Sequence, residues 1–300
     1  MAKRKKTPFY KKLSFWIITL LIVLGLLVGA AFALNHWLKS LDLDIHEPDP
    51  TQTPTSQAAA EDNQEEEPVE DDFSPIPTNP YTPVDFTMNE STGEMTLDNG
   101  KAVKGIDVSV WQGNIDWEKV KDSGVEYVMI RVGGRGTENG EIYEDKNAQK
   151  NYKGAKKAGL KIGAYFFSQS ITEEEAIEEA KYTLNAIEDW DLDMPVVFDW
   201  EYVDDDARSV EVDARGLTDM AKAFCDTVSD AGYEPMIYFG RSHSVDLLLL
   251  EELTEYQFWL AMYSPIMDYP YQVDMWQYTE TGSVPGIKGN VDMNLWFIYE

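Results

Sequence analysis

Three segments of this sequence repeat one pattern, in which a helical stretch ends in glycine and a β-rich apolar run follows at once. The glycines are Gly124, Gly159 and Gly232, each preceded by Ser or Ala. Glycine just beyond a helix adopts the left-handed backbone conformation that ends the helix, after which the chain can enter a strand. A chain that alternates helices and buried strands in this way is expected to fold as an α/β protein with a mostly parallel sheet.

The strand candidates are nearly continuous apolar runs, which are typical of parallel strands buried on both faces. They are VKGIDVSV, VEYVMIRV, LKIGAYFF, MPVVFDW, EPMIYF, QFWLAMY, VDMWQY and VDMNLWF. Helices fit between the first six runs, the last of these helices over about 245–253, but too few residues separate the final three runs for full crossover helices. The pattern predicts an α/β barrel that is regular at first and loses its helices near the C-terminus, with its active site at the C-terminal ends of the strands.

The segment before the globular part predicts a membrane anchor. Residues 1–13 carry several Lys and Arg and no acidic residue, and residues 14–38 contain an uncharged apolar run long enough to span a bilayer. The positive-inside rule then predicts a basic cytoplasmic tail, a single-pass transmembrane signal-anchor in the cell membrane, and an extracellular remainder. A cleavable signal peptide is the alternative, because Ala31-Phe32-Ala33 resembles a cleavage site.

Two further regions follow the predicted anchor. Residues 39–101 are rich in Pro, Thr, Ser, Gln and acidic residues without apolar periodicity, which predicts an extended acidic linker. Residues 102–300 are then the globular domain. The whole chain carries 25 Lys and Arg against 54 Asp and Glu, a net charge of −29. This charge gives no counterion-release drive toward phosphates and argues against nucleic acid as a partner.

The counts of cysteine and histidine narrow the chemistry. One cysteine excludes an intramolecular disulfide, and three histidines far apart in sequence argue against Ser-His-Asp, Cys-His and multi-histidine metal sites. The acidic run at residues 204–206 has the oxygen ligands of a hard-cation site, but its composition favours a solvated loop. Carboxylates are therefore the candidate catalytic groups.

Four carboxylates lie in otherwise apolar strands, where an ionisable group is costly to desolvate. They are Asp107, Asp199, Glu201 and Asp292. Asp199 and Glu201 are two residues apart, so in an extended chain both side chains point to one face while Trp200 points to the other. Their spacing lets two carboxyl groups flank one glycosidic bond, in either retaining or inverting geometry. Neighbouring negative charges also raise a carboxyl pKa, as a general acid requires.

Aromatic residues gather at the same strand ends, where flat apolar rings suit sugar faces and phenol hydroxyls suit sugar hydroxyls. They are Tyr165, Phe166, Tyr238, Trp259, Tyr263, Trp276 and Tyr278.

With these residues the sequence resembles glycoside hydrolase family 25, the Chalaropsis-type lysozymes that cleave bacterial peptidoglycan. The resemblance covers residues 102–300. It is carried by GIDVSVWQGNIDW, VMIRVGGRG, YEDKNAQKNYKGAKKAGLKIGAYFFS, MPVVFDWE and the closing WQY and GIKGNVDMNLW.

The resemblance implies a fold and a set of site residues. The fold is a flattened TIM-like barrel with five βα repeats followed by about three strands without full helices. Glu201 matches the proton donor, and Asp199 the carboxylate that stabilises developing positive charge or orients the substrate N-acetyl group. Asp107 and Asp292 match the remaining pocket acids. The implied substrate contacts are Tyr165, Tyr238, Trp276, Tyr278 and Arg131, the last of which could instead pair with a pocket acid.

The implied activity is that of a 1,4-β-N-acetylmuramidase on peptidoglycan, with no metal or cofactor, tethered to the membrane for local wall remodelling. One alternative is a non-catalytic wall-glycan-binding module on the same barrel. The other is a carboxylate-metal hydrolase, which the scarcity of histidine disfavours.

Overall fold

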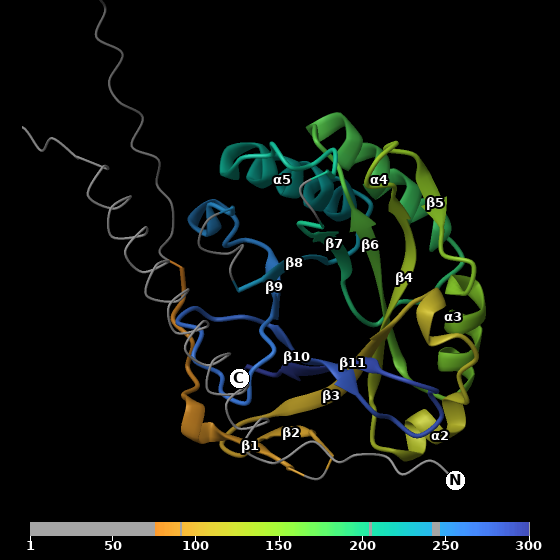
Figure 1. Ribbon diagram of the computed structural model, residues 1–300, viewed down its shortest axis with the longest axis vertical. Helices are drawn as coiled ribbons and strands as arrows, with labels where there is room; N and C mark the ends of the chain where they lie inside the picture. Colours follow the sequence, from red (N-terminus) through yellow and green to blue (C-terminus); the bar gives the residue numbers. More distant parts are fainter. Residues whose placement is uncertain (1–75, 91, 204–205, 242–246, 300) are drawn as a thin grey trace, which may run out of the picture. The chain divides into compact units, whose positions relative to one another are not determined.

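Eight strands close into a barrel in the computed structural model, which describes residues 76–299 apart from 91, 204–205 and 242–246 (Figure 1). Around the barrel the order is β3-β11-β10-β9-β8-β7-β6-β4, and a β3–β4 pairing closes it. These strands are β3 (Ala102–Val108), β4 (Tyr127–Arg135), β6 (Lys161–Ser168), β7 (Val196–Trp200), β8 (Pro235–Gly240), β9 (Gln257–Ala261), β10 (Met275–Gly282) and β11 (Val291–Phe297). All eight overlap the runs expected from the sequence, and a short edge strand, β5 (Ile142–Glu144), pairs with β4.

One barrel strand runs against the others. Strand β11 is antiparallel to both β10 and β3, whereas every other neighbouring pair in the barrel is parallel. The first residues of β11 therefore lie at the C-terminal ends of the parallel strands. This reversal places Asp292 directly opposite Asp107 in the β3–β11 register.

Side chains alternate between two buried layers, as strands buried on both faces require. On β8, Met236 and Tyr238 belong to the cluster inside the barrel, whereas Ile237 and Phe239 belong to the larger outer cluster. The outer cluster fills the space between the strands and the elements that cover them.

Helices cover the outside of the first part of the barrel. They are α2 (Trp117–Asp122), α3 (Ala148–Lys157), α4 (Glu173–Ala186) and α5 (Ala214–Asp230). Gly124, Gly159 and Gly232 have φ of 86°, 73° and 85°, which confirms the predicted helix endings. The five predicted βα repeats are not all present among the described residues. The helix expected over 245–253 is, in its described part, a 3₁₀ turn at η3 (Leu250–Glu252).

The linker prediction is wrong for residues 76–101. This segment forms the turn η1 (Pro83–Asp85) and an antiparallel hairpin of β1 (Phe86–Met88) and β2 (Met95–Leu97). The Phe86 ring packs edge-on against Trp276, with centroids 5.3 Å apart, and Met95 is buried. The hairpin covers the outer face of β10 and β11, which have no helices of their own. Composition failed to show this because a few apolar residues in a polar segment anchor it.

Within the described residues, no helix is long and apolar enough to cross a membrane. The predicted tail and anchor over 1–38, and the linker over 39–75, lie outside the described residues.

Candidate active site

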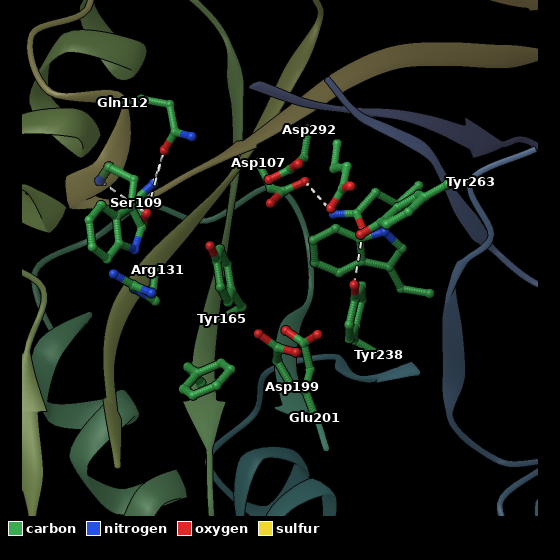
Figure 2. A pocket seen from close by; sticks show the side chains of 15 residues that line it. Asp107, Ser109, Gln112, Arg131, Tyr165, Asp199, Glu201, Tyr238, Tyr263 and Asp292 are labelled. Atoms are coloured by element: carbon green, nitrogen blue, oxygen red, sulfur yellow. Dashed lines mark hydrogen bonds between the residues drawn. The ribbon is translucent and has the colours of Figure 1, made fainter. Parts of the chain in front are cut away.

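A pocket of about 270 Å³ opens at the C-terminal ends of the barrel strands, where the barrel rule placed it (Figure 2). Every barrel strand, or the loop that follows it, contributes to this pocket. Its lining residues are Asp107, Ser109, Trp111, Gln112, Arg131, Tyr165, Phe167, Asp199, Glu201, Tyr238, Trp259, Tyr263, Gln277, Glu280 and Asp292.

All four predicted carboxylates meet in this pocket. Strand β7 ends at Trp200, and the side chains of Asp199 and Glu201 both line the pocket. Trp200 points to the outer layer, where its Nε1 donates to the Ser170 carbonyl oxygen at 3.1 Å. The alternation expected from a two-residue spacing is therefore confirmed, and Figure 2 shows the Asp199 and Glu201 carboxyl groups turned toward Asp107 and Asp292.

Asp107 is held by two buried amide side chains. Its Oδ2 accepts hydrogen bonds from Gln277 Nε2 at 2.9 Å and from Asn294 Nδ2 at 2.8 Å. The Gln277 Oε1 accepts from the hydroxyls of Tyr238 and Tyr263, both at 2.9 Å, which fixes the orientation of its amide. Asn294 is oriented in the same way by Trp259. Such donors favour the charged form of Asp107.

Asp292 and Asp107 form a carboxyl pair, in which the charge of one raises the cost of ionising the other. Burial, the charge of Asp107 and a hydrogen bond to Asp107 raise the pKa of Asp292 to about 9. Burial also raises the pKa of Asp107, while the hydrogen bonds from Asn294, Gln277 and Asp292 oppose that rise. Near neutrality the pair therefore holds one proton between two carboxyl groups, since two adjacent buried charges are costly.

The pKa of Glu201 is raised, as that of a general acid near neutrality must be. Burial and the charges of Asp107 and Glu280 raise its pKa to about 7. Burial, followed by the charges of Glu201, Asp107 and Asp292, raises the pKa of Asp199 well above its ordinary value. The buried Asp199 Oδ1 has no hydrogen-bond partner among the described residues.

The structure also places the predicted substrate-contact residues Tyr165, Tyr238 and Arg131 in the pocket. The rings of Tyr165 and Tyr238 pack edge-on against Trp259, with centroids 6.1 and 5.0 Å apart, and form an aromatic wall. Arg131 pairs with Asp145, Nε to Oδ2 at 3.0 Å, rather than with any of the four pocket acids.

Trp276 and Tyr278, the other two predicted contacts, do not line this pocket. Both belong to the outer cluster, and Trp276 Nε1 donates to the Met262 carbonyl oxygen at 2.9 Å. The prediction assigned the wrong face of the strand to the pocket: Gln277, which lies between Trp276 and Tyr278, is the residue that points inward. In a strand made of apolar and aromatic residues, the sequence shows that side chains alternate between two faces, but it does not show which face lines the pocket.

Several pocket residues were not predicted as site residues. Gln277 and Asn294 were missed because single amides in apolar strands attract less notice than carboxylates, although a buried amide also needs partners. Trp111, 81% exposed, stands at the pocket rim on the turn η2 (Val110–Gln112). Its exposure is unusual for so large an apolar side chain and is not readable from the sequence.

A buried glutamine anchors the segment that carries Glu201. The Gln169 Nε2 donates to the Glu201 carbonyl oxygen at 2.7 Å and to the Ser168 carbonyl oxygen at 2.9 Å. Its Oε1 accepts from Ser209 Oγ at 2.8 Å. Gln169 is fully buried, so these bonds tie the backbone just after β7 to the end of β6.

We expect Gln169→Met to lower kcat about tenfold with KM nearly unchanged, because small displacements of a catalytic group are costly in rate. Steady-state kinetics on a soluble glycan substrate would measure both constants. Ser209→Ala is the matched control, since it removes a bond to Gln169 but leaves the bond to Glu201. An equal loss of kcat in both variants, or a change in KM alone, would contradict the positioning role.

Paired carboxyl groups beyond a barrel strand, one with a pKa near 7 and both beside aromatic rings, are the arrangement that glycoside hydrolases use. The comparison with known proteins agrees, because the profile of glycosyl hydrolases family 25 matches residues 106–287, more than half of the sequence. The chain belongs to this family.

The similar proteins include several that are named lysozyme or autolysin. The chain is 31% identical over 195 residues to the autolytic lysozyme of Clostridium acetobutylicum, covering 64% of this chain and 55% of that protein. It is 27% identical over 202 residues to lysozyme M1 of Streptomyces globisporus, covering 64% of this chain and 67% of that protein. The crystal structure of the modular autolysin LytC from Streptococcus pneumoniae superposes with a TM-score of 0.59 at 27% identity, covering 71% of this chain and 52% of that chain. The chain thus spans about half the length of the first and last of these relatives.

Proposed function

We propose that this protein is a peptidoglycan hydrolase, a 1,4-β-N-acetylmuramidase that cleaves the β-1,4 bond between N-acetylmuramic acid and N-acetylglucosamine. The observation that carries the proposal is the placement of Asp199 and Glu201 in one pocket with Asp107 and Asp292. The relatives named lysozyme or autolysin support it, as does the solved complex of LytC with a synthetic peptidoglycan ligand.

In the proposed reaction Glu201 donates a proton to the glycosidic oxygen as the bond to the anomeric carbon breaks. A water molecule then supplies the hydroxyl group that bonds to this carbon, and its remaining proton returns to a pocket carboxylate, which restores the acid for the next turnover. The Glu201 pKa of about 7 keeps a useful fraction of this side chain protonated near neutrality. Asp199 lines the same pocket and is the group to orient the N-acetyl group or, in its ionised form, to stabilise the positive charge that develops on the sugar. Asp107 and Asp292, on β3 and β11, contact the sugar across the pocket, and Tyr165 and Tyr238 contact it from β6 and β8, which flank β7.

Nothing in this mechanism requires a metal or a cofactor. Among the described residues there is no group of three or more His, Cys, Asp or Glu side chains arranged to hold a metal ion. Two residues of the acidic run at 204–206 lie outside the described residues.

The proposal is tested by the chemistry of the products. Purified peptidoglycan would be digested with the protein, reduced with borohydride and analysed by mass spectrometry for new sugar ends. Muramitol ends are expected. Glucosaminitol ends would show that a different bond is cut, and intact wall binding without new ends would instead support a wall-glycan-binding module.

We further propose that residues 14–38 anchor the protein in the cell membrane, with its N-terminus in the cytoplasm and the barrel on the wall side. The uncharged apolar run and its basic flank support this placement. Such a tether would confine the muramidase to nearby wall and suit local remodelling. Cell fractionation is expected to find the intact chain in membranes, and a shortened form free in the medium would overturn the proposal.

A further inference from the structure

A second groove, of about 340 Å³, lies between the β1–β2 hairpin and the end of β10. The hairpin contributes Met88, Gly93 and Met95, and the barrel contributes Tyr278 and Thr281 among others. Met88 and Met95 are paired across the hairpin, so their side chains lie on the same face. The groove is therefore built jointly by the barrel and by the segment that precedes it.

This groove adjoins the candidate active site. Tyr263 and Glu280 line both cavities. Tyr263 is 52% exposed, and its hydroxyl donates to the Gln277 that holds Asp107. A polymer bound across the active-site pocket can therefore pass over Tyr263 into the groove without leaving the protein surface.

The chemical character of the residues that line the groove indicates which part of the glycan polymer can bind there. Methionine, tyrosine and proline side chains offer apolar surface to a sugar ring, and Ser264, Thr279 and Thr281 offer hydroxyl groups. No Lys or Arg is among the residues described as lining it, and Glu280 is negatively charged. This charge disfavours peptide stems and lactyl carboxylates, which are anionic, and favours the neutral N-acetylglucosamine residues of the strand.

The hairpin residues that line the groove lie before residues 106–287, the part of the chain that matches the family profile. Part of the lining of this groove thus comes from outside the matched segment.

We propose that this groove is an accessory sugar subsite that binds an N-acetylglucosamine residue of the same glycan strand, beyond the sugars held in the catalytic pocket. The inference rests on the proposed function, because it assumes that the pocket binds a peptidoglycan strand. The subsite lengthens the bound stretch of glycan and makes affinity depend on chain length.

The test measures binding to the full-length protein in detergent, with Glu201→Gln introduced to prevent turnover. Calorimetry with peptide-free peptidoglycan oligosaccharides would compare a disaccharide with a hexasaccharide. Adding Met88→Ala is expected to weaken the binding of the hexasaccharide about tenfold and to leave the disaccharide unchanged. Met88 is 40% exposed, so its truncation leaves the core intact.

The matched control is Thr87→Ala, which lies on the same strand and points to the opposite face of the hairpin. It is expected to leave both affinities unchanged. Unchanged binding of the hexasaccharide by the Met88→Ala variant would overturn the subsite, as would a loss seen only with fragments that carry peptide stems. Failure of the proposed function is separate, because it would appear as absence of cleavage by the unmodified protein.

Discussion

Replacing Glu201 by glutamine is expected to reduce peptidoglycan cleavage by about a thousandfold while leaving substrate binding largely intact. Glutamine keeps the size of the side chain but has no acidic proton to give to the leaving sugar, and general acid catalysis contributes about 10²–10⁴ in rate. The release of new reducing ends would measure the rate, and calorimetry with a glycan fragment would measure binding. Cleavage within tenfold of that of the unmodified protein would exclude Glu201 as the acid.

The pKa of Glu201 also predicts how the cleavage rate falls on the alkaline side of its pH profile. A general acid acts in its protonated form, and the pKa of Glu201 is raised to about 7. The rate constant is therefore expected to fall as the pH rises through about 7. Glu280→Gln removes one of the charges that raise this pKa, so it should shift the fall in rate to lower pH. An unchanged alkaline limb in this variant would contradict the assignment of that limb to Glu201.

The second large effect is expected from the hairpin that covers β10 and β11. Deleting residues 76–97 should prevent stable folding, because it exposes the outer faces of Trp276 and Phe297, which lie against Phe86 with ring centroids 5.3 and 6.0 Å away. Phe86→Ala is the milder variant, with an expected loss of about 3 kcal/mol in the free energy of unfolding. This corresponds to a fall of about 6–12 °C in melting temperature.

Thermal unfolding followed by circular dichroism would measure this change in the full-length protein. Val84→Ala is a suitable control, since Val84 lies two residues before Phe86 and is 83% exposed. It is expected to shift the melting temperature little. If Phe86→Ala were as stable as this control, the hairpin would not be part of the folded core.

The strands and the acidic residues of the site could be predicted from the sequence because each leaves a local mark. A buried strand is a continuous apolar run, and a carboxylate within such a run is conspicuous. The antiparallel direction of β11 has no local sequence signal, because it depends on which strands pair with β11. The sequence also did not show which residues of β10 face the inside of the barrel. Trp276, Gln277 and Tyr278 are compatible with either orientation of the strand, and long-range packing decides between the two.

The hairpin shows a different limit of prediction. Its polar, acidic surroundings resemble a linker, and the residues that hold it down, Phe86 and Met95, are ordinary by themselves. Their role follows only from the uncovered outer faces of β10 and β11, about 180 to 210 residues further along the chain. Composition therefore identified the region before the barrel as polar but placed the start of the folded part too late.

The pairing of β3 with β11 has a consequence for when this protein can act. Asn294 and Asp107, hydrogen-bonded across these strands, are 187 positions apart in the sequence. A ribosome-bound chain that has not yet released β11 has an open barrel, an unheld Asp107 and no Asp292 beside it. The complete pocket would thus form only after β11 has been synthesised and has paired with β3, so that a chain stalled before β11 would lack a complete active site.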